Sequence, residues 1–264
     1  MTIARYWWWG LLALVAVASG RVVLERLIFF PDPVMPPAPP GVVDRFITTA
    51  DGVRIHAWWA PPPSRGPTLL WSHGNAGNVG NRAAILMALV ARRLGVLAYD
   101  YRGYGRSEGT PDETGVYRDS EAAYDEVRAL GVPAERIVCF GESLGGAVSI
   151  RLATVRPVAG VAVVATFPSL RDVARVHYGV AGAAIGGRFD MRQRLARLAV
   201  PLLVAHGDED EIVPYELGQR LYEAAPGPKR FVRVPGATHN DVLGFPGLLD
   251  AVAAFADEVA AQSR

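Results

Sequence analysis

The sequence contains a single cysteine, Cys139, and a single lysine, Lys229, among its 264 residues. One cysteine excludes an internal disulfide framework and any zinc site built from several thiolates. The 27 basic and 26 acidic side chains leave a net charge of +1, which argues against a nucleic-acid partner because such proteins need a basic face. Charged residues make up only 20% and hydrophobic residues 50%. The chain is therefore not disordered and has enough apolar side chains for a large core.

Charge is also absent from residues 6–20, where three tryptophans precede the run LLALVAVA. At about 1.5 Å per residue this stretch spans roughly 22 Å as a helix, and the apolar residues 22–24 extend it toward the roughly 30 Å of a bilayer core. We therefore expect residues 1–30 to be a membrane anchor, with the rest of the chain on the extracytoplasmic side. The alternative is a signal peptide cleaved near residues 16–18, Ala-Val-Ala, which leaves a secreted or periplasmic protein.

After the anchor, residues 31–41 read PDPVMPPAPPG, which predicts a stiff, polyproline-like spacer. The remaining residues, 42–264, have a length that suits one domain.

Strands and helices are expected to alternate through residues 42–264. A hairpin is predicted from residues 45–49 and 53–59, which flank the turn residues Ala50-Asp51-Gly52. The further expected strands are 68–72, 96–100, 137–140, 159–165, 201–205 and 230–234, and the expected helices are 82–94, 114–130, 144–154, 216–225 and 248–261. This alternation predicts an α/β fold with a mostly parallel sheet covered by helices on both faces. Residues 167–198 interrupt the alternation, so we expect them to form a lid over one end of the sheet.

Ser143 lies in the motif GESLGG, between a predicted strand and a predicted helix. This strand–turn–helix context is the one that a nucleophile elbow requires, because a tight turn there presents the hydroxyl above the sheet edge. Glycines beside the serine remove side chains that would clash with the strand and the helix. The sequence therefore favours Ser143 as a nucleophile over a simple glycine-rich turn.

A serine nucleophile needs a base, and the base needs an acid that orients it. The segment HGDEDEIVP follows one predicted strand and GATHN follows the last one. The chain order Ser…Asp…His is the order expected with a nucleophile elbow. We expect His239 to be the base and Asp210 the acid. Asp208 also qualifies by position, but Asp210 is better spaced to turn back to the sheet edge.

An oxyanion hole needs two backbone N–H groups aimed at the developing oxyanion. Leu144, directly after the nucleophile, is expected to supply one of them. The other should come from the loop HGNAGN after the first parallel strand, with Asn75 as the first choice and Ala76 as the second.

Other polar residues are weaker candidates. His206, Asp208, Asp210 and Glu211 cluster in the sequence, but no second histidine stands at helical spacing, so we expect no metal and no other cofactor. Cys139 lies within a predicted strand and is expected to be a core residue.

Five further side chains near the motifs are expected to support a loop or to contact the substrate. His73 is expected to bond within its own loop, and His177 is a candidate substrate contact from the lid. Arg102 and Arg106 are expected to fix their loop, and Tyr101 is a candidate pocket residue.

Taken with their order along the chain, these motifs resemble the α/β-hydrolase superfamily. More narrowly, the sequence resembles the membrane-anchored branch that includes eukaryotic α/β-hydrolase-domain proteins, some of which are depalmitoylases. The resemblance covers nearly the whole chain and rests on LIFFPDP, TADGVRIHAWW, HGNAGN, YRGYGRSEG, GESLGG, RFD, HGDEDEIVP and GATHND. It implies the α/β-hydrolase fold, with Ser143, Asp210 and His239 as the triad and Asn75 and Leu144 as oxyanion donors.

The expected function is therefore that of a cofactor-free serine hydrolase, which cleaves carboxylic esters or thioesters through an acyl-enzyme. The expected partners are a small-molecule or lipid-like acyl substrate and a membrane, with no nucleic acid. A serine peptidase of the same fold and a non-catalytic, membrane-tethered binding protein are the alternatives. An epoxide hydrolase or a dehalogenase would need a carboxylate in place of Ser143.

Overall fold

The computed structural model describes residues 28–63 and 66–262. The chain divides into two compact units, residues 1–30 and residues 31–264. The predicted anchor lies almost entirely outside the described residues. Within those residues, no helix is both long and apolar enough to cross a bilayer.

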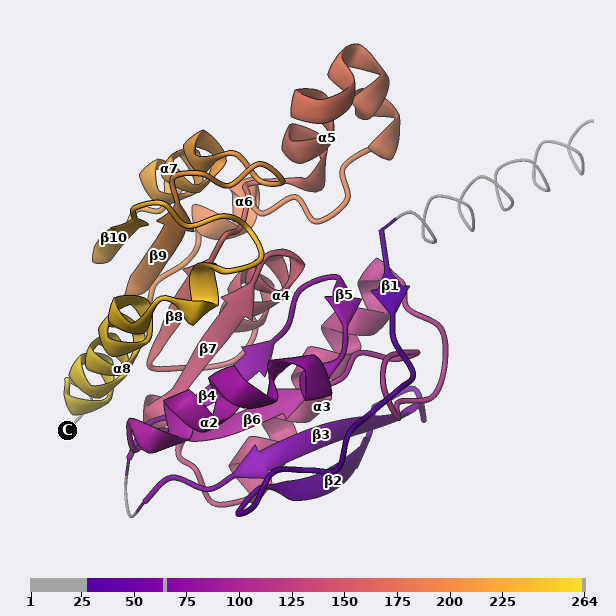
Figure 1. The fold of residues 1–264 in the computed structure, drawn as a ribbon, viewed down its shortest axis with the longest axis vertical. Coiled ribbons are helices and arrows are strands. Elements are labelled where there is room, and N and C mark those ends of the chain that lie inside the picture. Colours follow the sequence, from indigo (N-terminus) through magenta and orange to yellow (C-terminus); the bar gives the residue numbers. More distant parts are fainter. Residues whose placement is uncertain (1–27, 64–65, 263–264) are drawn as a thin grey trace, which may run out of the picture. The chain divides into compact units, whose positions relative to one another are not determined.

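An eight-stranded sheet forms the centre of the second unit (Figure 1). Its strands lie in the order β10-β9-β8-β7-β4-β6-β3-β2. The six strands from β10 to β6 are mutually parallel, while β3 and β2 join as an antiparallel hairpin. Their bounds are β2 Val43–Thr48, β3 Arg54–Ala60, β4 Thr68–Ser72, β6 Gly95–Tyr99, β7 Ile137–Glu142, β8 Gly160–Val164, β9 Leu202–Gly207 and β10 Lys229–Val234. The mostly parallel α/β sheet expected from the sequence is confirmed.

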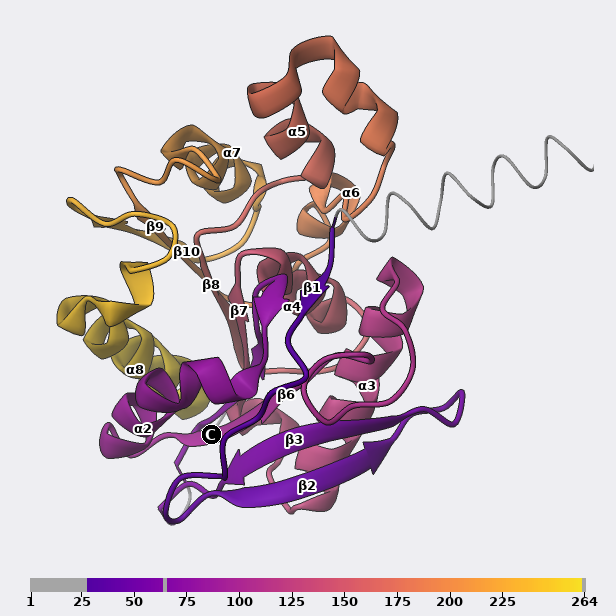
Figure 2. The same ribbon diagram turned by 45° about the vertical axis from the view of Figure 1, so that its right-hand side comes forward.

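Helices cover both faces of this sheet because its central strands are buried on both sides. Helices α3, α4 and α7 lie on one face, while α2 and α8 pack together on the other (Figures 1 and 2). The core between the sheet and the α2–α8 face includes Trp71 and Phe140, whose ring centroids are 5.3 Å apart. The helix bounds are α2 Ala83–Ala91, α3 Glu113–Ala129, α4 Leu144–Ala153, α7 Tyr215–Ala224 and α8 Pro246–Ala261.

Strand β7 is longer than its apolar run suggested. It continues through Gly141 and Glu142, which pair with Val163 and Val164 of β8. The ladder therefore carries regular structure up to the residue before Ser143. This extension fixes the direction in which the chain enters the turn.

The segment 167–198 stands beyond the carboxyl ends of the parallel strands (Figure 2). It contains α5 (Leu170–Tyr178), the 3₁₀ segment η3 (Gly179–Ile185) and α6 (Arg192–Leu195). Ser169 caps the start of helix α5, and its side chain accepts a hydrogen bond from the Asp172 N–H. Exposed apolar side chains gather on this segment, namely Val176, Tyr178 and Val180.

The proline-rich residues 31–41 are bonded to the domain rather than standing free of it. The Asn78 amide donates to the carbonyl oxygens of Asp32 and Val34, each at 2.8 Å. These bonds join positions more than forty residues apart, so the composition of the proline-rich run alone did not reveal them. The remaining short elements are β1 Phe30–Pro31, β5 Ala76–Gly77, η1 Val79–Arg82, η2 Ala134–Arg136 and η4 Val242–Gly244.

Candidate active site

Ser143, Asp210 and His239 come together at the carboxyl edge of the sheet. They follow β7, β9 and β10, and parallel strands bring their carboxyl ends to one edge. The His239 Nε2 lies 3.0 Å from the Ser143 Oγ, and its Nδ1 lies 2.8 Å from the Asp210 Oδ2. For Nε2 to accept the hydroxyl proton, Nδ1 must carry the proton that is donated to Asp210.

The backbone of Ser143 is held in a conformation that few non-glycine residues adopt. Its φ is +52° and its ψ is −118°, values that cost free energy and persist only where the surroundings enforce them. The Ser143 N–H donates to Val164 O at 2.9 Å, and the Thr166 hydroxyl donates to Ser143 O at 2.7 Å. A side chain at Gly146 would collide with Thr166. The turn therefore depends on glycine at that position.

The Asp210 carboxylate is held by backbone donors on one oxygen and by imidazoles on the other. Its Oδ1 accepts from the N–H groups of Ile212 and Val213, at 3.0 and 2.7 Å. Its Oδ2 meets His239, and also the Nε2 of His206 at 3.2 Å. Burial on its own raises the pKa of Asp210, but the hydrogen bonds from His206, His239 and Val213 outweigh it and hold that pKa well below its usual range.

The alternative acid, Asp208, points elsewhere. Its carboxylate pairs with Arg233 and accepts from the Gly236 N–H at 2.6 Å. These bonds, chiefly the one from Arg233, lower the pKa of Asp208. Asp208 thus closes a turn between β9 and the loop after β10, while Asp210 meets His239.

The contact between His206 and Asp210 was not predicted from the sequence. The His206 side chain is fully buried, and its Nε2 also lies 2.8 Å from Val213 O. Gly218 packs directly against the ring. The only sequence signal for this contact was the spacing of four residues between His206 and Asp210 in HGDED. The turn between them folds Asp210 back over His206.

The two segments expected to supply oxyanion donors pack against each other. Leu144 is the first residue of α4, and N–H groups in the first turn of a helix have no intrahelical acceptor. Asn75 lies in the loop after β4, where its carbonyl accepts from the Tyr104 hydroxyl at 2.7 Å. A Cβ at Gly145 would lie 2.6 Å from His73 O, so the start of α4 rests directly on the end of β4.

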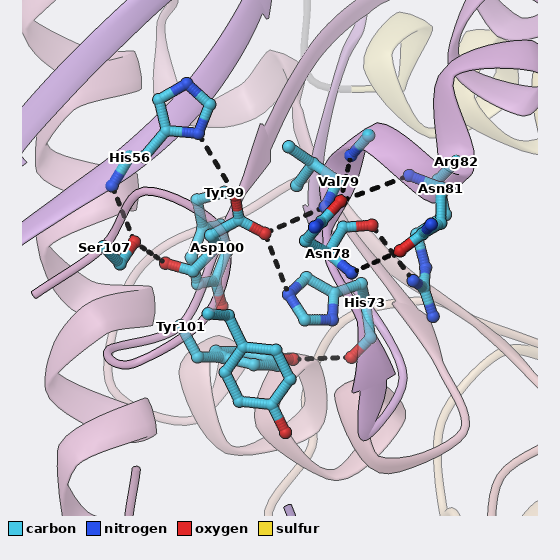
Figure 3. A network of polar contacts seen from close by, with 12 residues as sticks. His56, His73, Asn78, Val79, Asn81, Arg82, Tyr99, Asp100, Tyr101 and Ser107 are labelled. Carbon is cyan, nitrogen blue, oxygen red and sulfur yellow. Dashed lines mark hydrogen bonds and ion pairs between the residues drawn. The ribbon is translucent and has the colours of Figure 1, made fainter. Parts of the chain in front are cut away.

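Beneath that loop lies a buried polar network around Asp100 (Figure 3). Its Oδ2 lies 3.1 Å from the His56 Nδ1, and its Oδ1 accepts from the Val79 N–H at 2.8 Å. The His73 Nδ1 lies 2.6 Å from Gly74 O, so its bond is within its own loop. Burial, with the charge of Arg82, holds the pKa of His73 well below its usual range and keeps the imidazole neutral.

The remaining candidates are bonded away from Ser143. Tyr101 is fully buried and donates to His73 O at 2.8 Å, so it supports the loop and does not line an open pocket. Arg102 holds Asp51 and Asp119, and the Nε2 of His177 lies 2.8 Å from Ile212 O.

A cysteine nucleophile and a metal centre are two other kinds of site. Burial raises the pKa of the Cys139 thiol to about 12, which disfavours the thiolate that a nucleophile needs. Among the described residues, no group of three or more His, Cys, Asp or Glu side chains is arranged to hold a metal ion.

Comparisons with known proteins give consistent matches. The family model described as serine aminopeptidase, S33, of the Hydrolase_4 family, matches residues 64–184 and 169–243. The chain is 38% identical to the uncharacterized Mycobacterium tuberculosis protein Rv2307c, over 94% of each chain. It is 32% identical to the α/β-hydrolase domain-containing protein WAV2 of Arabidopsis thaliana, over 90% of this chain and 88% of that protein. Among solved structures, the Pyrococcus furiosus esterase Pf2001 superposes with a TM-score of 0.72 at 22% identity, over 86% of this chain and 96% of the esterase.

Proposed function

Because the chain belongs to the α/β-hydrolase superfamily and is a hydrolase, we propose that it is a serine hydrolase that cleaves carboxylic esters or thioesters through an acyl-enzyme. Ser143 is the nucleophile, His239 the general base and Asp210 the acid that orients it. The observation that carries the proposal is the continuous pair of contacts, 3.0 and 2.8 Å, that links the Ser143 hydroxyl through His239 to Asp210.

In the proposed acylation step, the Ser143 Oγ attacks the acyl carbonyl while its proton passes to the His239 Nε2. Asp210 keeps the required tautomer and stabilises the imidazolium that forms. The N–H groups of Asn75 and Leu144 donate to the oxyanion. Collapse of the tetrahedral intermediate expels the alcohol or thiol, which takes the proton from His239. Water, activated by the same imidazole, then releases the acid and restores Ser143.

The family description favours a second candidate, a serine aminopeptidase. An aminopeptidase needs a carboxylate to hold the α-ammonium group of its substrate. The acidic side chain next to the nucleophile, Glu142, is already paired with Arg82 through contacts of 2.9 and 3.0 Å. We therefore favour the ester or thioester substrate, and turnover of amino-acid p-nitroanilides faster than of esters would reverse this preference.

We also propose that residues 1–30 anchor the protein in a membrane, with the domain on the extracytoplasmic side. The alternative is that these residues include a signal peptide that is cleaved. A lipid-like acyl substrate, as in the depalmitoylase-like branch, is supported by the exposed Val176, Tyr178 and Val180 of the segment above the site. Membrane fractionation of the full chain, with mass analysis of its N-terminus, separates an anchor from a cleaved peptide.

Labelling by a fluorophosphonate probe tests the nucleophile. The wild-type protein is expected to react covalently and Ser143→Ala to give no adduct. Hydrolysis of p-nitrophenyl esters of increasing chain length, with Ser143→Ala as the control, then reports the acyl preference. Undiminished labelling of the variant would overturn the assignment, and a rate independent of Ser143 at every chain length would favour a non-catalytic binding protein.

A further inference from the structure

Arg82 connects two segments of the site that are far apart in the sequence. Its guanidinium donates to both oxygens of Glu142, from Nε at 2.9 Å and from Nη2 at 3.0 Å. Its remaining nitrogen, Nη1, donates to the carbonyl oxygens of Ala76 and Asn78, at 3.0 and 3.1 Å. Glu142 is the residue before Ser143, and the two carbonyls lie just after Asn75 in the chain. One side chain therefore bonds both walls of the proposed oxyanion hole.

The connection lies in a close-packed part of the molecule. The Arg82 and Glu142 side chains are only 14% and 21% exposed. A Cβ at Gly74 would lie 3.2 Å from the Glu142 Oε1 and 3.3 Å from the Arg82 Nη2, and one at Gly77 would lie 3.2 Å from the Arg82 Nη1. Two glycines of the loop thus flank the ion pair, and the loop cannot shift toward β7 without displacing it.

We infer that Arg82 is a positioning residue that sets the distance between the Asn75 and Leu144 N–H donors. The inference rests on the proposed function, since it assigns these two groups to the oxyanion hole. The hydrogen bonds of Arg82 go to Glu142, Ala76 and Asn78, and not to Ser143, Asp210 or His239. It acts by holding the loop after β4 against the strand that ends at Ser143.

The geometry of the guanidinium makes arginine necessary for this role. Its planar fork satisfies the Glu142 carboxylate with two nitrogens and leaves a third for the carbonyls. Lysine keeps the positive charge, but its single nitrogen lacks the fixed fork that spans both segments. The variant Arg82→Lys therefore removes the bridge between the two segments while it keeps the positive charge.

Arg92 provides a matched control on the same helix. It directly follows α2 as the C-cap residue, while Arg82 directly precedes α2 as the N-cap residue, so the two arginines stand at opposite ends of this helix. Its Nε donates to the Asp250 Oδ1 at 2.7 Å and its Nη1 to Ala88 O at 2.9 Å. Arg92→Lys thus removes a contact between the end of α2 and the Asp250 carboxylate of α8, together with a contact to a backbone carbonyl of α2 itself, at the end of the helix opposite to Arg82.

The test compares wild type, Arg82→Lys and Arg92→Lys with a p-nitrophenyl ester whose turnover depends on Ser143. A displaced oxyanion donor weakens only transition-state binding, so we expect kcat of Arg82→Lys to fall about 10- to 100-fold with KM nearly unchanged. Inhibition by phenylboronic acid, which forms a tetrahedral adduct with a serine, should weaken by a similar factor. Arg92→Lys should match wild type in kcat, KM and boronate inhibition.

Several outcomes would overturn the inference. A folded Arg82→Lys variant with wild-type kcat, or one in which only KM changes, would show that the bridge does not set the distance between the two N–H donors. If Arg92→Lys lost as much kcat as Arg82→Lys, the loss would come from lower stability of the protein and not from a displaced oxyanion donor. If Arg82→Lys does not fold, Glu142→Gln weakens the same bridge at its other end, because it removes the negative charge and one of the two acceptor oxygens. This variant must also lose kcat and boronate affinity. A wild type with no Ser143-dependent turnover would instead refute the proposed function itself, and this inference with it.

Discussion

Gly145 packs so tightly on Ser72 that a Cβ at position 145 would overlap the Ser72 carbonyl oxygen. Gly145 is the second residue of α4 and Ser72 is the last residue of β4. This contact brings the helix that follows Ser143 onto the strand that precedes the Asn75 loop. The requirement for glycine here comes from the lack of space, since its φ is not positive.

We expect Gly145→Ala to destabilise the protein by about 1–3 kcal/mol, the usual cost of overpacking, and to reduce labelling of Ser143 by a fluorophosphonate. The control is Gly247→Ala, at the second position of α8, where an added Cβ meets nothing within 4 Å. That variant should be neutral or stabilised by up to about 1 kcal/mol. Urea unfolding measures both, and equal stability of the two variants would contradict the packing argument.

Substitution of the two neighbouring aspartates should distinguish the acid from the turn residue. Asp210→Asn cannot hold the His239 tautomer, so we expect kcat to fall by about 10⁴-fold, as in other serine triads. Asp208→Asn changes only the contacts with Arg233 and Gly236 and should leave kcat close to the wild-type value. Steady-state ester hydrolysis by both variants is the measurement. The reverse ranking would move the acid to Asp208.

The lowered pKa of Asp210 predicts how stability responds to acid. Its folded-state pKa lies below the value of about 3.9 for an unfolded aspartate, so its ionised form stabilises the fold above about pH 4. That contribution should be lost as the pH falls from there through the folded-state pKa. Urea unfolding at about pH 7 and about pH 3 should show a smaller decrease for Asp210→Asn than for wild type. An equal decrease would mean that the carboxylate is not selectively stabilised in the folded state.

The lone thiol offers a test of the core around β7. Cys139 is fully buried and its pKa is raised by burial to about 12, so the native protein should not react with a disulfide reagent at mildly alkaline pH. Unfolding in guanidinium chloride should release one reactive thiol per chain. Rapid modification of the native protein, or loss of ester hydrolysis on modification, would contradict this burial.

The strands were predictable because each central one is a short apolar run between turn signals, as in Thr68–Ser72, where predicted and observed bounds agree. That Ser143, Asp210 and His239 meet also followed from the sequence, since each comes after a strand and parallel strands end at one edge. The catalytic roles of the three residues stay predictions until the variants are measured.

Contacts between polar side chains at long range could not be predicted. Arg82 and Glu142 are 60 residues apart, and nothing in either local segment indicates the other. The same holds for Asn78 and the proline-rich residues it binds, which are 46 and 44 residues away. Such pairs depend on how the layers pack, and apolar periodicity reports only which side of an element is buried.

The order of the strands has a consequence for synthesis of the protein. The proposed base, His239, lies 96 residues after Ser143 and follows the strand at the edge of the sheet. At about 5–20 residues per second, a ribosome needs about 5–20 s to add that stretch. Throughout this interval the growing chain carries a serine without its base. The proposed pair of nucleophile and base is therefore complete only after the last strand, β10, has been made and has joined the sheet.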